Sequence, residues 1–147
     1  MVAMPKLNLT TKKRRKEKGI AQLKKDLWKL FALYVKKKAS EDGHHVNCYT
    51  CDAPMEIGTS SCHAGHWLSK KGSSRHYFNE DNVRPQCYRC NINLGGNAPV
   101  FERRLKEEIG EEKVEEMYET RLISIKRTRD WYLEKIEDYK QKLEAFN

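Results

Sequence analysis

The sequence lacks any long apolar segment and is poor in apolar residues overall. Of its 147 residues, 38% are hydrophobic and 34% are charged, so only a small core can form. No apolar run approaches the ~18 residues that a membrane-spanning helix requires, and residues 1–18 lack the apolar centre of an export signal. These absences argue against a membrane or secreted protein, and we expect a soluble protein in the cytoplasm.

Internal repeats are absent apart from two C-x-x-C pairs, which use four of the five cysteines. Cys48 and Cys51 form the first pair, Cys87 and Cys90 form the second, and 35 residues lie between the pairs. This spacing is typical of a four-thiolate zinc site in which each pair holds the ion from a tight turn. Two redox disulfides are the alternative, but the absence of an export signal favours thiolates in a reducing compartment. We therefore predict a structural zinc ion that supports the small core.

Acidic residues are scarce in the amino-terminal third of the chain. Residues 1–47 contain 13 basic and four acidic residues, whereas residues 48–98 have a net charge of +1 and residues 99–147 of −2. Residues 1–18 form a basic arm with little to bury, which we expect to be disordered until it meets an acidic partner. A basic arm beside a nearly neutral centre predicts binding to a polyanion, with nucleic acid the first candidate. A solvated lysine face is the alternative.

Apolar spacing predicts an amphipathic helix over residues 19–40. The apolar positions recur every three or four residues, at Ile20, Leu23, Leu27, Leu30, Phe31 and Tyr34. The opposite face carries Lys24, Lys25, Lys29 and Lys36. These lysines serve either to bind phosphates or to keep the helix soluble.

Residues 99–147 are expected to form a helical tail. Pro99 suits the first turn of a helix over residues 100–109, which Gly110 ends, and a second helix follows over residues 111–122. Beyond Thr128, a candidate cap, the apolar residues of 131–146 fall in nearly a heptad repeat. This seam either closes over the first helix of the chain or pairs with a second copy.

Residues 46–98 should form a compact zinc module between these helices. We expect a short hairpin with Pro54 and Gly58 in turns, a strand over residues 62–68 and a second strand at residues 76–78. Residues 92–97 are expected to form a short helix with a glycine stop. The predicted fold class is therefore α+β.

One histidine and two asparagines of this module are candidates for chemistry. His66 lies between the cysteine pairs, Asn82 precedes the second pair and Asn91 directly follows the last cysteine. Histidine is a natural general base near pH 7, and Asn82 can hydrogen-bond across the hairpin to orient it. The carboxamide oxygen of Asn91 suits a hard divalent ion such as Mg²⁺. This set predicts metal-assisted hydrolysis of phosphodiesters; packing, turn and capping roles are the alternative.

Two groups of basic residues are expected to contact DNA phosphates. Near the site they are Lys70, Lys71, Arg75 and Arg84, and in the arm they are Lys12, Lys13, Arg14 and Arg15. Because the sequence shows no base-reading motif, binding should be to the DNA backbone and strongly dependent on salt.

These motifs resemble the HNH (His-Me finger) endonucleases, and specifically the lambdoid phage NinG family of recombination endonucleases, also called Rap. The resemblance is carried by residues 48–51, 64–67, 78–82, 86–91 and 95–97. It implies a treble-clef ββα-metal (HNH) zinc module, with His66 as general base and Asn91 as a ligand of catalytic Mg²⁺ or Mn²⁺. It also implies cleavage of branched recombination intermediates, such as Holliday junctions and D-loops, inside a bacterial host cell.

Gly65 departs from this pattern. Most HNH nucleases carry Asp or His immediately before the base as a metal ligand, and NinG-like sequences tend to carry an acidic residue three places before it, where this chain has His63. The candidates to complete the metal shell are His63, Asn97 and a bound phosphate.

The predicted activity is thus that of a structure-selective DNA endonuclease that leaves 5′-phosphate and 3′-hydroxyl ends. The main alternative is a non-catalytic zinc-binding DNA adaptor, and a third reading is an RNA-binding knuckle. A symmetric junction favours a homodimer joined through the helical tail. Phage or host recombination proteins are candidate partners.

Overall fold

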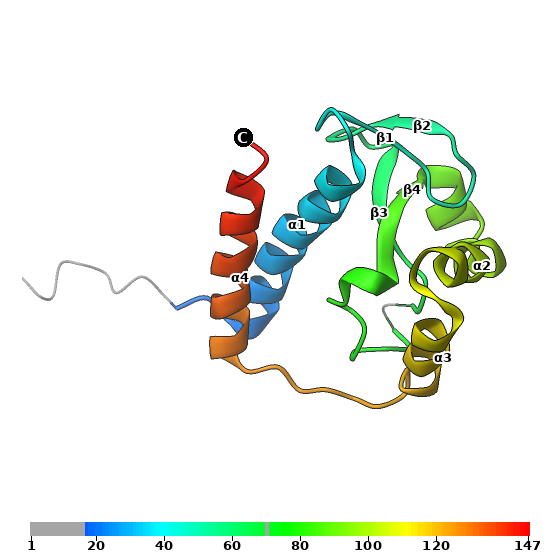
Figure 1. The fold of residues 1–147 in the computed structure, drawn as a ribbon. Helices are drawn as coiled ribbons and strands as arrows, with labels where there is room; N and C mark the ends of the chain where they lie inside the picture. The colour runs from blue at the N-terminus through cyan, green and yellow to red at the C-terminus, as the bar shows by residue number, and fades with distance from the viewer. Residues whose placement is uncertain (1–16, 70) are drawn as a thin grey trace, which may run out of the picture.

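The computed structural model describes residues 17–69 and 71–147, which form a mixed α+β fold (Figure 1). Helix α1 (Ile20–Ala39) lies between helix α4 (Arg129–Glu144) and a hairpin of strands β3 (Cys62–His66) and β4 (Val83–Cys87). Within the described ranges, no helix is long and apolar enough to cross a membrane. Some residues that we expected to contact DNA lie outside the described ranges: Lys12, Lys13, Arg14, Arg15 and Lys70.

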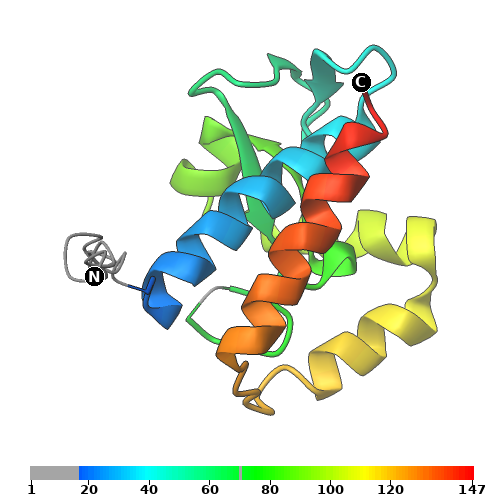
Figure 2. The same cartoon turned by 90° about the vertical axis from the view of Figure 1, so that its left-hand side faces the viewer.

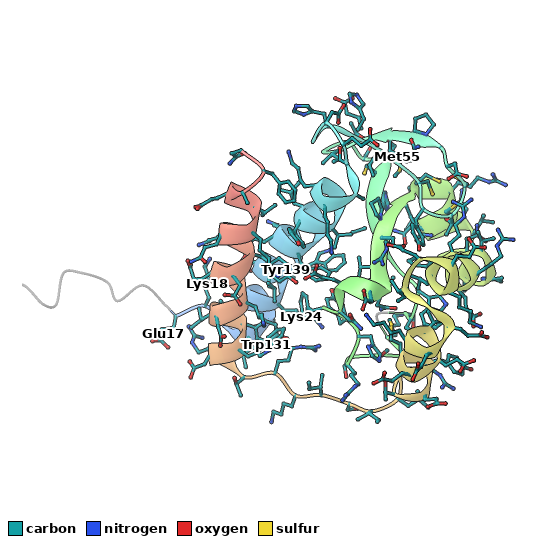
Figure 3. The ribbon with its side chains drawn as sticks, in the orientation of Figure 1. Glu17, Lys18, Lys24, Met55, Trp131 and Tyr139 are labelled. Carbon is teal, nitrogen blue, oxygen red and sulfur yellow. The ribbon has the colours of Figure 1, made fainter. Side chains whose placement is uncertain are left out.

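The largest buried core lies where α1 packs on α4, and Figure 2 shows the two helices side by side. Leu27 and Phe31 of α1 are fully buried, and Phe31 meets Tyr139 of α4 edge to face with the ring centroids 5.3 Å apart. Tyr139 lies between the two helices in Figure 3. Thr128 caps α4 by accepting a hydrogen bond from the N–H of Trp131 at 3.1 Å. The apolar seam of the tail therefore closes over the first helix of the same chain.

Two short antiparallel hairpins lie against these helices. Strand β1 (His45–Asn47) pairs with β2 (Pro54–Glu56). Strand β3 pairs with β4 in a register that sets Cys62 opposite Cys87 and His66 opposite Val83. A strand that carries His66 is thereby confirmed.

Two details of the predicted module were wrong. Residues 76–78 form a turn, and the partner of β3 is β4. Aromatic residues in this segment resemble a strand, but Phe78 packs on Phe31 from the turn, with the ring centroids 5.6 Å apart. Pro54 begins β2 instead of occupying a turn, which is possible because the first residue of an edge strand need not donate a ladder hydrogen bond.

Helices α2 (Ala98–Ile109) and α3 (Glu111–Glu119) lie on the other side of the β3–β4 hairpin (Figure 1). Gly110 separates them at φ +97°, a conformation that L side chains rarely adopt. The first of these helices agrees with the prediction, whereas α3 ends at Glu119 and not at residue 122.

A π-helical turn, η2 (Arg89–Asn93), follows β4 directly. It begins before the predicted helix of residues 92–97, whose second half is a turn with Gly95 and Gly96 at positive φ. Cys90 and Asn91 therefore lie inside a helical turn that starts from the end of the hairpin.

Replacing Phe31 with alanine should weaken the attachment of α4. The buried ring contacts Trp28, Phe78 and Tyr139, so the cavity should lower the free energy of unfolding by ~3–5 kcal/mol. Urea unfolding followed by circular dichroism measures the change. The control is Leu133→Ala on α4, where the side chain is 42% exposed; equal losses in both variants would contradict the packing described.

Candidate metal centre and active site

Four cysteine sulfurs converge where β1, β4 and η2 meet. The Sγ atoms of Cys48, Cys51, Cys87 and Cys90 all lie within 4.8 Å of one another, and those of Cys51 and Cys87 are 3.6 Å apart. A tetrahedral zinc ion with Zn–S bonds of ~2.3 Å separates its sulfurs by about 3.8 Å. All five cysteines of the chain are free thiols. The four clustered residues thus form a possible zinc site, as the spacing predicted.

Polar groups around the cluster point at its sulfurs. The Thr50 hydroxyl lies 3.5 Å from Cys48 Sγ, and the Cys90 N–H donates to Cys87 Sγ at 3.4 Å. Asn97 donates from Nδ2 to Cys90 Sγ at 3.8 Å, so its side chain faces the sulfur cluster. Such donors stabilise thiolates and hold metal ligands in place.

The clustered thiols differ in acidity. Burial raises the pKa of Cys48, but hydrogen bonds from Thr50 and from backbone N–H groups outweigh this effect and bring the pKa to about 6. Burial instead holds the pKa of Cys51 and of Cys87 above the ordinary thiol value. Ionisation of Cys51 and Cys87 beside Cys48 therefore needs a cation to balance the charge.

His66, the candidate general base, is held between two aromatic rings and a backbone carbonyl. It stacks on Trp28 of α1 with ring centroids 4.9 Å apart, and it lies against Tyr77 at 5.0 Å. Its Nε2 lies 2.9 Å from the Tyr77 carbonyl oxygen. Because a carbonyl only accepts, Nε2 carries the hydrogen and, in the neutral ring, Nδ1 carries the lone pair.

Asn82 acts on the loop that connects β3 to β4. It is fully buried; its Nδ2 donates to the carbonyls of Leu68 (3.1 Å) and His76 (3.0 Å), and its Oδ1 accepts from the Leu68 N–H at 2.8 Å. These bonds tie together the two ends of the loop that presents the Tyr77 carbonyl. The expected bond across the hairpin to His66 is thus replaced by hydrogen bonds to the loop backbone, and Asn82 acts on His66 through the loop.

Asn91 lies on the other side of strand β3 from His66. Side chains alternate along a strand: His63 and Gly65 face η2, whereas Ala64 and His66 face α1. Asn91 Nδ2 lies 2.9 Å from His63 Nδ1. The structure therefore brings Asn91 to His63, on the face of β3 opposite to His66.

The basic residues near the site divide into exposed and engaged groups. Lys71 and Arg75 are exposed, and Lys24 of α1 places Nζ 4.4 Å from the centre of the Tyr77 ring. The Arg84 side chain is only 14% exposed and pairs with Glu108 at 3.4 Å. Arg84 thus makes a structural contact, whereas Lys71 and Arg75, which we also expected to contact phosphates, are exposed.

The family model of the bacteriophage lambda NinG protein matches residues 5–147. The chain belongs to the NinG family. No curated protein and no solved structure matches it significantly. The NinG resemblance noted in the sequence is confirmed, and the match includes the helices on either side of the four-cysteine cluster.

Arg127 of this NinG-family protein holds the loop of Tyr77 from the segment before α4. Its guanidinium donates to the carbonyls of Ser74 (2.8 Å) and Arg75 (3.1 Å), and it lies 5.4 Å from the Phe78 ring centre. The sequence offered no signal for this role, because Arg127 lies in an irregular linker about 50 residues from its partners.

Gln86 also went unnoticed in the sequence, because nothing marks a polar residue inside a strand as buried. It is fully buried in β4, and its Nε2 donates to the Gly96 carbonyl at 2.8 Å and to Thr50 Oγ1 at 3.0 Å. A Cβ added to Gly65 would lie 1.8 Å from Gln86 Oε1. The glycine that departs from the HNH pattern is therefore required by the side chain of the neighbouring strand.

The NinG-family protein should contain one zinc ion per chain, and Cys51→Ala should lose it. Removing one of four ligands weakens zinc binding and the connection that the ion makes between the two hairpins and η2. The melting temperature should therefore also fall. Mass spectrometry of elements and calorimetry measure the two effects. The control is Cys62→Ala, since Cys62 is buried but lies outside the cluster; full zinc in the Cys51 variant would argue against the site.

Proposed function

We propose that this NinG-family protein is an endonuclease that hydrolyses phosphodiester bonds in branched DNA, such as Holliday junctions or D-loops. The observation that carries the proposal is the orientation of His66. Its Nε2 lies 2.9 Å from the Tyr77 carbonyl oxygen and so carries the hydrogen, which makes Nδ1 the basic nitrogen of the neutral ring. The β3–β4 hairpin, followed by η2 and next to four clustered sulfurs, supports the proposal of a treble-clef ββα-metal (HNH) module.

In the proposed reaction, His66 Nδ1 takes a proton from a water molecule while the water oxygen attacks phosphorus. The bond to the 3′-oxygen breaks, this oxygen takes a proton from solvent, and the ends are a 5′-phosphate and a 3′-hydroxyl. Asn91 is the proposed ligand of a Mg²⁺ or Mn²⁺ ion. The ion, when bound, supplies charge that neutralises the phosphate. The zinc ion is structural, because four thiolates leave it no open position.

Positive charge beside the site supports DNA as the substrate. Lys24 lies over Tyr77, and Lys71 and Arg75 are exposed on the loop that Tyr77 belongs to. The preference for branched DNA follows from the family resemblance. A homodimer and contacts with recombination proteins stay predictions, and the α4 seam is already used within the chain.

A non-catalytic DNA adaptor is the second candidate, and one observation favours it. His66 is only 8% exposed and stacks on Trp28 with the ring planes 17° apart. A histidine packed in this way can serve simply to attach α1 to the hairpin. DNA would then bind through the exposed lysines of α1 without being cut.

His66→Ala should lower Mg²⁺-dependent cleavage by ~10²–10⁴-fold, because the reaction loses its general base. The measurement is a panel of linear, flapped, D-loop and four-way DNA with Mg²⁺ or Mn²⁺. Zinc content and DNA affinity of the variant should stay unchanged, and His44→Ala, at an exposed position, is the matched control. Undiminished cleavage by His66→Ala, or none by the native protein with either ion, would favour the adaptor.

Lys24→Ala should weaken DNA binding and its dependence on salt. Loss of one phosphate contact lowers the slope of log affinity against log salt concentration by ~0.9. Fluorescence anisotropy of labelled four-way DNA at several salt concentrations gives the slope. Lys113→Ala, at an exposed position of α3, is the control. Identical slopes in the two variants would show that Lys24 is a solvent-exposed lysine that contacts no phosphate.

A further inference from the structure

We infer that Gln86 and Asn91 together bind the divalent cation through their side-chain amide oxygens, while His63 orients Asn91 and is not itself a ligand. The role of this ion in hydrolysis rests on the proposed function. Its position rests on two amide groups whose orientations the surrounding hydrogen bonds determine.

Gln86 has one possible orientation. Its Nε2 donates to the Gly96 carbonyl and to Thr50 Oγ1, and a flipped amide would set Oε1 against the Gly96 oxygen. Oε1 therefore points toward Gly65, where it is buried and has no hydrogen-bond partner among the described residues. A buried amide oxygen without a partner is uncommon in folded proteins and calls for an explanation, such as an ion.

The orientation of Asn91 follows from His63. His63 Nε2 lies 2.8 Å from the Ser60 carbonyl oxygen, so this nitrogen carries the hydrogen and Nδ1 is an acceptor. Nδ1 accepts from Asn91 Nδ2 at 2.9 Å. The amide nitrogen of Asn91 thus faces His63, and Oδ1 is turned away from it, toward Gly65. Both ring nitrogens of His63 are engaged in these bonds.

Both amide oxygens lie beside Gly65. A Cβ built on Gly65 would lie 1.8 Å from Gln86 Oε1 and 3.1 Å from Asn91 Oδ1. Amide oxygens are hard ligands of the kind that Mg²⁺ and Mn²⁺ accept, so both can contribute to binding one ion beside Gly65. Gln86, from the neighbouring strand, thereby supplies the ligand that HNH nucleases carry at the position of Gly65.

Two neutral ligands predict weak binding that responds to added charge. An ion held by amide oxygens keeps its full charge and fills its other positions with water or substrate phosphate. A carboxylate in place of either amide should therefore tighten the site. This expectation separates a ligand from a residue that only packs there.

Titration of the zinc-loaded full chain with Mn²⁺, followed by electron paramagnetic resonance, tests the inference. Gln86→Glu should tighten Mn²⁺ binding by about tenfold or more, because a charged ligand replaces a neutral one. Gln86→Met and His63→Ala should each weaken it by ~10–100-fold. Gln141→Glu, at an exposed position of α4, controls for added charge. Unchanged affinity in both Gln86 variants, with zinc retained, would overturn the inference.

A measurement on the native protein covers the case in which the Gln86 variants fail to fold. Substoichiometric Mn²⁺ broadens nuclear magnetic resonance signals close to the ion. The side-chain amide signals of Gln86 and Asn91 should broaden first, well before that of Gln141. Broadening centred on any other group would overturn the inference.

The outcomes of these experiments and of the cleavage assay are separable. If Mn²⁺ binding depends on Gln86 but cleavage is unaffected by His66→Ala, the ion site is supported and the role of His66 as general base is rejected. If cleavage needs His66 but Mn²⁺ binding does not depend on Gln86, the nuclease proposal is supported and the ion site at Gln86 and Asn91 is rejected.

Discussion

The convergence of four sulfurs is the constraint on which the rest of the structure depends. The strands are short, with three residue pairs between β1 and β2 and five between β3 and β4, and two-stranded hairpins of this size are marginally stable by themselves. The cluster joins both hairpins to η2. Because Cys90 immediately precedes Asn91, holding the Cys90 sulfur in the cluster also fixes the backbone position of Asn91. The pairing of Cys62 with Cys87 sets the register of β3, which determines the face of the strand on which His63 and His66 lie.

The helices also help to hold His66 in place, partly through the loop between β3 and β4. Trp28 of α1 covers His66, and α4 in turn covers α1. The loop is held at its ends by Asn82 and along its length by Arg127. The tautomer of His66 therefore depends on contacts made by residues far from it in sequence.

Features with a local cause could be predicted from the sequence, and features that depend on distant contacts could not. The C-x-x-C spacing, the apolar face of α1, the cap at Thr128 and the stop at Gly110 each follow from neighbouring residues. The pairing of β3 with β4 was mistaken because aromatic residues in a half-buried turn resemble a strand. The burial of Gln86 and the ion pair of Arg84 with Glu108 involve partners that only the fold brings together. For the same reason, a glycine that looked like a missing ligand in the sequence has a steric cause in the structure.

The chemistry of the two candidate ion sites differs in a way that can keep them apart. Four thiolates are soft, charged ligands that select zinc, whereas two amide oxygens are hard and neutral. A zinc ion gains far more from the sulfurs than from the oxygens, so the sulfur cluster should take zinc first and leave the proposed oxygen site to Mg²⁺ or Mn²⁺. The sites are nevertheless coupled through structure, because Gln86 and Cys87 are neighbours in β4 and Cys90 and Asn91 are neighbours in η2. A fully coordinated zinc ion would then affect the second ion only indirectly, by fixing the positions of Gln86 and Asn91.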